Sequence, residues 1–308
     1  MSDPTPILMW FRRDLRLSDH AALCAACDTG RPVIPVFICD SLVEGLAAAP
    51  KWRLGLGLGE LGASLEGRSS RLILRRGADA MEVLRALIRE TGAGAVYWSR
   101  LYDPDSIARD SRIKESLKSE GIEARSFGGH LMFEPWTIET KTGGFYKVYT
   151  PFWNTAKRVD VATPRPVPST IPVPKAWPAS DDLNTWQMGA GMNHGAEVVR
   201  PFVRLGEAAA QARLAEFTEH IVAGYQQTRD LPGEDGTSNL SENLALGEIS
   251  PHQCWHAGRR AMEEGKQGAE TFLKELVWRE FAYHLMHHTP RILDRNWREE
   301  WEAFPWQE

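Results

Sequence analysis

The sequence predicts an α/β region followed by an all-α region: a doubly wound parallel sheet of five strands, a long linker, and a helical domain. Three observations support this fold class. Residues 7–128 alternate short apolar runs with helical segments, residues 161–195 are rich in proline and glycine without a period, and residues beyond 206 show helical spacing only. A chain of 308 residues suits two domains, and its 43% hydrophobic and 25% charged residues are typical of a folded globular protein.

Short apolar runs bounded by turns predict the buried parallel strands, at residues 7–11, 33–39, 72–74, 95–98 and 124–127. Ser18 is expected to cap a helix over residues 21–27, and Pro50 to start another. Further helices are expected around residues 84–88 and over 105–119. The alternation predicts right-handed crossovers between parallel strands.

The first strand is followed by a charged cluster, Arg12 to Arg16, and not by the G-x-G-x-x-G pattern of a dinucleotide site. A structural ion-pair network at the strand end is the favoured interpretation. A ligand of this sheet is therefore expected beyond the carboxyl ends of the strands.

The predicted boundaries are residues 1–130 for the sheet domain, 131–200 for an extended linker and 201–308 for the helical domain. Helices are expected at residues 209–221, 241–246, 250–263 and 269–287. Ahead of the second of these, Thr237, Ser238 and Ser241 offer hydroxyls at a helix start. That pattern is typical of a helix cap and also of a phosphate site, and both interpretations stay open.

Glu275, Trp278 and Arg279 can share one face of the last long helix. An ion pair between Glu275 and Arg279 beside a core tryptophan is the simpler explanation. Together with the hydroxyls and with Tyr225 and Arg229, they favour a combined polar and aromatic site.

Several motifs resemble the photolyase and cryptochrome family, in the same order and across nearly the whole chain: WFRRDLRLSDHAAL, YKVYTPFW, YQQTRDLP, GTSNLS, GEISP and ELVWREF. The chain is most similar to microbial class I cyclobutane pyrimidine dimer photolyases. The resemblance implies an N-terminal antenna domain, a helical domain that holds FAD, and light-driven repair of pyrimidine dimers in DNA by electron transfer from photoexcited reduced FAD.

The resemblance also assigns residues. Flavin-binding positions match Tyr225, Thr237, Ser238, Asn239, Leu240, Ser241, Phe272 and Arg279. Glu275 and Trp278 match catalytic positions that receive the flipped-out dimer, with Arg229 on the DNA. Trp306 matches the outermost tryptophan of an electron-transfer chain.

Asp40, Arg53 and Asp103 are candidates for the lining of a second, antenna chromophore site. Asp105 and Ser106 stand where some family members bind folate through an Asn-Glu pair, so a deazaflavin or another flavin is expected instead. Family members continue beyond the position of Glu308, so the resemblance implies a chain truncated within its FAD-binding domain, which leaves an inactive fragment as one alternative.

UV-damaged DNA is the expected partner, and a monomer is expected. A cytoplasmic location is expected because no leader and no apolar run of about 18 residues is present. His284, His287 and His288 near Glu280 lack the H-E-x-x-H spacing, so we expect a solvated helix face and no metal site. Two alternatives stay open: a cryptochrome-like blue-light photoreceptor, and a nucleotide-binding enzyme that uses the sheet alone.

Overall fold

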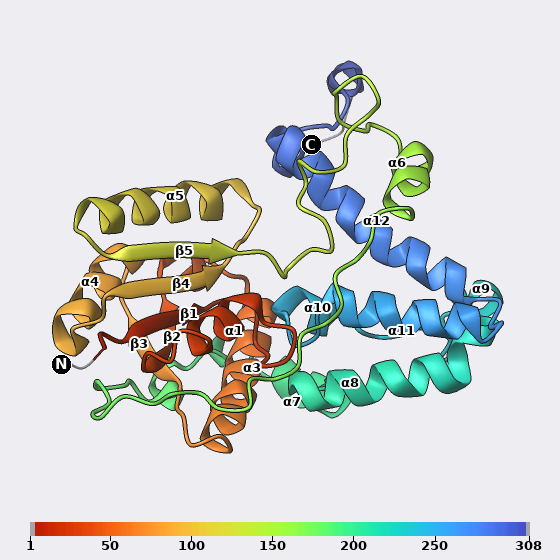
Figure 1. Ribbon diagram of the computed structural model, residues 1–308. Coiled ribbons are helices and arrows are strands. Elements are labelled where there is room, and N and C mark those ends of the chain that lie inside the picture. The colour runs from red at the N-terminus through yellow and green to blue at the C-terminus, as the bar shows by residue number, and fades with distance from the viewer. Residues whose placement is uncertain (1–3, 306–308) are drawn as a thin grey trace.

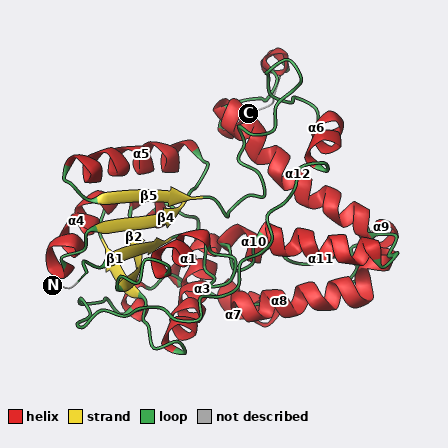
Figure 2. Ribbon diagram, in the orientation of Figure 1, coloured by secondary structure: helices red, strands yellow, loops and turns green. Residues whose placement is uncertain are grey.

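The computed structural model describes residues 4–305 and contains one sheet of five parallel strands beside a group of helices (Figures 1 and 2). The strand order is β3-β2-β1-β4-β5, which confirms the predicted doubly wound sheet. The strands are β1 (Ile7–Phe11), β2 (Val33–Cys39), β3 (Ile73–Arg76), β4 (Ala95–Ser99) and β5 (Glu123–Phe127). Because β3 and β4 lie on opposite sides of β1, the chain reverses its direction of winding between β1 and β4, which is where such sheets bind ligands.

Helices cover both faces of this sheet: α1 (Ala21–Cys27), α2 (Ser41–Glu44), α3 (Ala48–Glu66), α4 (Ala80–Thr91) and α5 (Pro104–Ser119). Successive side chains of β1 enter different cores. Ile7, Met9 and Phe11 pack with residues of α1 and α3, whereas Leu8 and Trp10 pack with residues of α4 and α5. A strand buried on both faces needs an unbroken apolar run, which explains why the sequence located β1 and β2 without error.

Two predicted helix starts are wrong. The cap of α1 is His20, whose Nδ1 accepts a hydrogen bond from the amide of Leu23, and not Ser18. The Ser18 hydroxyl instead bonds Glu207, far along the chain. Helix α3 begins at Ala48, ahead of Pro50, because proline fits anywhere in a first turn that needs no amide donors.

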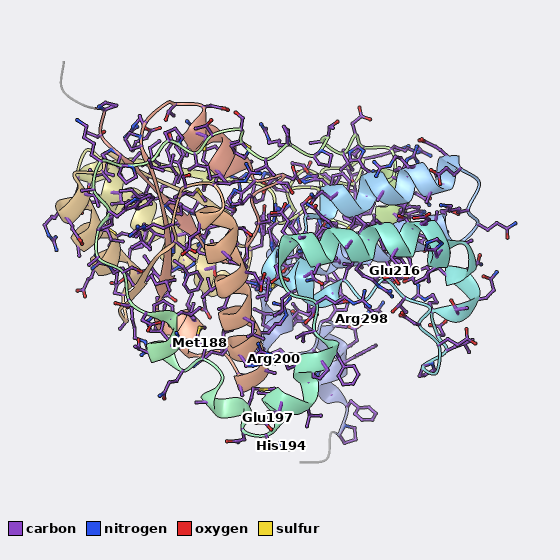
Figure 3. All side chains as sticks on the ribbon, turned by 90° about the horizontal axis from the view of Figure 1, so that it is seen from below. Met188, His194, Glu197, Arg200, Glu216 and Arg298 are labelled. Atoms are coloured by element: carbon purple, nitrogen blue, oxygen red, sulfur yellow. The ribbon has the colours of Figure 1, made fainter. Side chains whose placement is uncertain are left out.

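The segment expected to be an extended linker packs against both regions in part of its course, although residues such as Val148 and Val198 are exposed. Its first part carries α6 (Tyr149–Ala156), and Phe152 of that helix is buried with the helical region. Its second part returns to the sheet, where Ile171, Trp186 and Met188 join the core on the α3 side. Met188 lies against Gly55 of α3 (Figure 3). The short helices here are Leu183–Trp186, Ala190–Met192, α7 (Gly195–Val199) and Arg200–Phe202.

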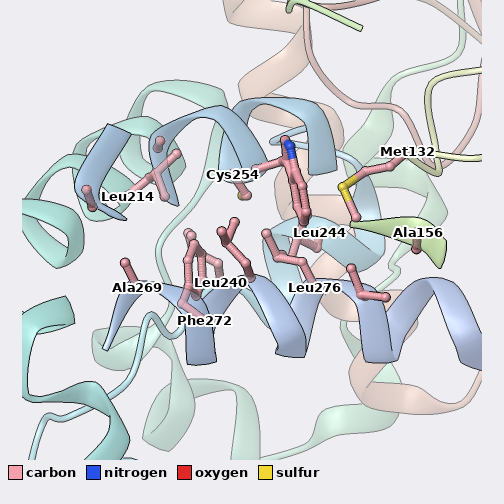
Figure 4. Close-up of a cluster of buried hydrophobic side chains, with 14 of the residues drawn as sticks. Met132, Ala156, Leu214, Leu240, Leu244, Cys254, Ala269, Phe272 and Leu276 are labelled. Atoms are coloured by element: carbon pink, nitrogen blue, oxygen red, sulfur yellow. The ribbon is translucent and has the colours of Figure 1, made fainter. Parts of the chain in front are cut away.

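The helical region consists of α8 (Gly206–Glu216), α9 (Tyr225–Thr228), α10 (Ser241–Leu246), α11 (Pro251–Glu263) and α12 (Ala269–His288), with single turns at Phe217–Ile221, Val222–Gly224, Pro290–Leu293 and Glu299–Ala303. Its core lies between α11 and α12, where Leu240, Leu244 and Phe272 are buried (Figure 4). Helix α11 starts in a capping box between Ser250 and Gln253. Within residues 4–305, no helix combines the length and apolar character that crossing a membrane requires.

Two features join the sheet to the helices. Gly247 ends α10 in a left-handed conformation, with φ +68°, and a Cβ there would lie 2.2 Å from the carbonyl oxygen of Arg13. Arg53 of α3 forms an ion pair with Glu248, at 2.5 Å between Nη2 and Oε2, and both side chains are almost fully buried. The two regions therefore meet at backbone contact distance and share a buried charge pair.

Candidate functional site

A cavity of ≈ 580 Å³, here called the helical cavity, opens among α9, α10, α12 and the loop that precedes α10. Its lining residues are Arg13, Tyr225, Arg229, Thr237, Ser238, Asn239, Ser241, Leu244, Ala245, Phe272, Glu275, Leu276, Arg279 and Tyr283. The structure thus brings together most of the residues assigned from the sequence, although they are spread along the chain from Tyr225 to Arg279. Two of them lie elsewhere: Leu240 is buried in the core, and Trp278 is outside the lining.

Some hydroxyls of this cavity have partners: that of Thr237 donates to Asn239 at 2.8 Å, and that of Tyr283 lies 2.9 Å from His130. Within residues 4–305, the side chains of Ser238 and Ser241 and the phenol of Tyr225 have no hydrogen-bond partner, although all three line the cavity. The cap expected from the sequence does not form, because the N-cap of α10 is Leu240 and no side chain bonds its first turn. The unpartnered hydroxyls therefore remain available to a ligand.

A buried arginine holds the hydroxyl loop in place. Arg213 of α8 donates from Nη2 to the Thr237 carbonyl at 2.7 Å and from Nε to the Ser238 carbonyl at 3.0 Å, and it pairs with Asp235 at 2.7 Å. Asn239 adopts φ +52°, and its amide donates to the same Asp235 at 2.8 Å. Sequence reasoning missed Arg213, because it lies on a helix whose pattern shows only ordinary amphipathic spacing.

Glu275 and Arg279 do not pair with each other as the simpler explanation of their spacing required. Glu275 forms an ion pair with Arg229, whose guanidinium also lies 5.5 Å from the ring of Tyr225. Arg279 instead contacts Glu280 at 3.1 Å and the Nε2 atom of His130 at 3.2 Å. Glu275 is thus held by a partner from another segment, and Arg279 by its neighbour Glu280 and by His130, which fixes the direction of both side chains.

The group that holds Arg279 was also missed. His130 follows β5, is buried, and lies 2.9 Å from the hydroxyl of Tyr283. Burial and then the charge of Arg279 lower the pKa of His130 well below its usual value, so the imidazole is neutral and can accept a hydrogen bond. Arg13 was missed as well: its neighbour Arg12 is bound to Asp110, while Arg13 reaches the helical cavity with its Nε on the Ala245 carbonyl.

Trp278 stands at the surface of α12 and not in the cavity. Its ring stacks on Tyr149 with 3.6 Å between centroids and an interplanar angle of 7°, and the residue is 46% exposed. Phe272 has two roles, since it packs against Phe217 in the core and also forms part of the cavity wall. Trp306, assigned to electron transfer, lies outside the described residues.

A second, smaller cavity of ≈ 280 Å³, here called the sheet cavity, lies at the carboxyl ends of β1 and β2, at the predicted edge. Of the three antenna candidates, only Asp103 lines it. Asp40 lies beside it, bound to Arg109 of the lining at 2.8 Å. Arg53 is not in the lining, because its guanidinium is committed to Glu248 and Glu242.

The cluster after β1 is mostly structural, as expected. Arg12 is bound to Asp110 at 2.7 Å and lies over the ring of Trp10, and Asp14 contacts His20 at 2.9 Å. Arg16 is fully enclosed and donates to backbone carbonyls, including that of Gly247. This network joins the strand end to the helices. Arg12 and Arg13 also line the sheet cavity, and Arg13 lines the helical cavity as well.

The expectation of a solvated face for the histidines of α12 is wrong in part. His284 and Glu280 are buried, and His284 bonds the segment predicted to be the linker through both ring nitrogens. Its Nδ1 lies 2.9 Å from the Pro135 carbonyl oxygen, and its Nε2 accepts a hydrogen bond from the amide of Tyr146 at 3.0 Å. Among the described residues, no group of three or more His, Cys, Asp or Glu side chains is placed to hold a metal ion.

Comparison with known proteins places this geometry in a class. A family model described as DNA photolyase matches residues 7–171, more than half of the chain. The chain belongs to the DNA photolyase family, which confirms the resemblance of its motifs.

Individual relatives agree. The chain is 41% identical over 305 residues to the deoxyribodipyrimidine photo-lyase of Agrobacterium fabrum, covering 98% of this chain and 64% of that protein. A solved bacterial class III photolyase from Agrobacterium tumefaciens superimposes with a TM-score of 0.95 at 41% identity, covering 100% of this chain and 64% of that one. Cryptochrome-1 of Arabidopsis thaliana is 28% identical over 312 residues, covering 97% of this chain and 46% of that protein. The chain therefore spans about two thirds or less of the length of these relatives, and its similarity to the photolyases is greater than to this cryptochrome.

Proposed function

We propose that this chain carries one wall of the flavin and lesion site of an enzyme that repairs cyclobutane pyrimidine dimers in DNA with light. The observation that carries the proposal is the helical cavity, where free hydroxyls, held cations and an apolar surface meet. The names of the relatives support the activity, which is a property of whole proteins longer than this chain. The greater identity to photolyases favours repair over the signalling role of a photoreceptor.

The cavity fits FAD in the chemistry of its donors. Ser238, Ser241 and Tyr225 can donate to phosphate or ribose oxygens, and Arg13 adds positive charge. The apolar wall of Leu244 and Leu276 suits a flat ring system. A bound reduced flavin supplies light-driven one-electron transfer to the dimer.

The chain's own residues orient the two reactants. Arg279, held by His130 and Glu280, would place its charge toward the flavin. Glu275 presents its free carboxylate oxygen for a hydrogen bond to a base, because the other oxygen is bound to Arg229. Trp278 offers a ring face on which an extruded base can stack, worth about 1 to 3 kcal/mol per base. The same stacking offsets part of the free energy of flipping the lesion out of the duplex.

The sheet cavity is the proposed place of a second chromophore, a deazaflavin or another flavin. Asp103 and Arg109 give it polar groups, and Phe37 and Leu54 give it an apolar surface. The domain boundaries at 130 and 200 remain proposals that rest on the composition of the sequence, and the cytoplasmic location and the monomeric state remain proposals as well.

A flavin titration followed by illumination tests the function. We expect FAD to bind the purified chain, and Tyr225→Phe together with Ser241→Ala to weaken that binding, because two donors are lost. With reduced flavin bound, illumination of dimer-containing DNA should restore thymine absorbance, and a dark sample should not. Flavin binding without any photorecovery in a full-length relative carrying these residues would contradict the repair role of the site, and absence of flavin binding would contradict the cavity assignment.

A further inference from the structure

The exposed tryptophan of α12 has one covered face. Tyr149 of α6 lies parallel to Trp278 with ring centroids only 3.6 Å apart. Aromatic pairs in proteins usually adopt offset or edge-to-face arrangements with centroids 4.5 to 7 Å apart, because the ring quadrupoles repel in a direct sandwich. A sandwich this close therefore requires other contacts that hold both rings.

Those contacts are present. The hydroxyl of Tyr149 donates to the carbonyl of Lys274 at 2.7 Å, which is the carbonyl one helical turn before Trp278. Burial and then the charge of Glu275 raise the pKa of Tyr149, so the phenol keeps its proton and remains a donor. The ring of Phe281 packs edge-to-face with the rings of Tyr149 and Trp278, with 5.8 Å between centroids in each pair. Tyr149 is thus fixed to the helix that carries the indole.

The consequence lies in the opposite face of the indole. Since Trp278 remains 46% exposed with one face against Tyr149, the exposed area is concentrated on the other face and the ring edge. An unsupported surface tryptophan would lose rotamer freedom when a base stacks on it, and that loss would weaken binding. A ring already held parallel to the ring of Tyr149 avoids that loss.

We propose that Tyr149 is a positioning residue, which holds the indole of Trp278 in a single orientation so that one face receives a flat, unstacked base. This inference rests on the proposed function and deepens it, because it assigns the stacking surface to a pair of residues from α6 and α12. Tyr149 touches no reactant and acts only through Trp278.

The test has a spectroscopic arm that is independent of DNA. Protein labelled with 5-fluorotryptophan gives a fluorine resonance for Trp278, assigned by its absence in Trp278→Phe. Tyr149→Leu should move and broaden this resonance, because the ring current of the tyrosine is lost, whereas Tyr149→Phe should keep most of the shift. Tyr146→Phe is the matched control: it removes a hydroxyl bond to Thr155 in the same segment without touching Trp278. An unmoved resonance in a folded Tyr149→Leu protein overturns the proposal.

The second arm measures affinity for an oligonucleotide with a thymine dimer, relative to the undamaged one. Tyr149→Leu should weaken dimer binding about three- to tenfold, and Tyr149→Phe should recover most of it. Equal dimer affinity in the wild type and Tyr149→Leu, with the resonance shifted, overturns the positioning role while leaving the proposed function intact. If the wild type does not prefer dimer DNA, the proposed function fails and this inference fails with it.

Discussion

Two serines show how the polar groups of the two regions differ. Ser18, at the end of the sheet, bonds Glu207 and accepts from Gln211 at 3.1 Å and Gln253 at 2.8 Å. Ser241, at the helical cavity, has no side-chain partner within residues 4–305. Both lie in motifs that the sequence marks as notable. The difference teaches that Ser18 in the sheet region helps to build the seam between the regions, while the hydroxyls of Ser238, Ser241 and Tyr225 at the helical cavity are left for a ligand.

The largest expected effect is at that seam. Glu248→Gln should lower the free energy of unfolding by about 3 to 5 kcal/mol, because the buried guanidinium of Arg53 loses its main counter-charge. Urea denaturation measures it. The matched control is Arg85→Gln, which breaks a solvent-exposed pair with Glu120 and should change stability by less than about 1 kcal/mol. Equal changes in the free energy of unfolding for the two variants would contradict the claim that the buried pair at the seam stabilises the protein more than an exposed pair.

Gly247→Ala should destabilise the protein by about 3 kcal/mol. The left-handed backbone disfavours a Cβ by about 1 to 2 kcal/mol, and the overlap with the Arg13 carbonyl adds the strain of overpacking. Gly265→Ala is the control, since it has φ +83° but no atom within 4 Å of a new Cβ. The difference between the two thermal or urea midpoints isolates the close contact of the two regions.

Two buried groups, one turn apart on α12, should give opposite pH dependence. Burial lowers the pKa of His284 to about 4, so its stabilising contribution is complete above pH 6.5 and is lost as the pH falls toward 4. Burial raises the pKa of Glu280 to about 7, so its contribution is complete below pH 4.5 and is lost as the pH rises through 7. Each is worth up to about 3 kcal/mol.

Denaturation curves from pH 4 to 8 separate these groups. His284→Gln should make stability fall less toward acid than in the wild type, and Glu280→Gln should make it fall less toward neutral pH. The glutamine in each variant can keep some of the neighbouring hydrogen bonds. The slope of the free energy of unfolding against pH is therefore more informative than its absolute value. Changes of slope with the same sign would contradict the assignment.

The smallest effects compare the serines directly. Ser18→Ala should destabilise by about 1 to 3 kcal/mol, because its half-buried partners Glu207 and Gln253 lose a bond. Ser241→Ala should leave the free energy of unfolding within about 0.5 kcal/mol and weaken FAD binding instead. Loss of stability in Ser241→Ala with unchanged flavin affinity would reverse the comparison.

The sheet could be predicted from the sequence because a strand buried on both faces needs a continuous apolar run, as in β1 and β2. The helix bounds of α10 and α11 followed from local signals such as Ser250 and Pro251. The site residues were assigned through motifs, but the residues that hold them in place could not be predicted. Arg213 and His130 reach the site from other elements of the chain. The partner of Glu275 also depends on tertiary packing, since spacing alone suggested Arg279.

The path of the predicted linker, residues 131–200, has a consequence for synthesis of the chain. All five strands leave the ribosome before residue 130, yet Ile171, Trp186 and Met188 complete the core beneath them. Domains tend to fold from the N-terminus as they emerge. We therefore expect one apolar face of the nascent sheet to stay incompletely covered while roughly 60 further residues are synthesised. At ordinary rates of elongation this takes about 3 to 12 seconds.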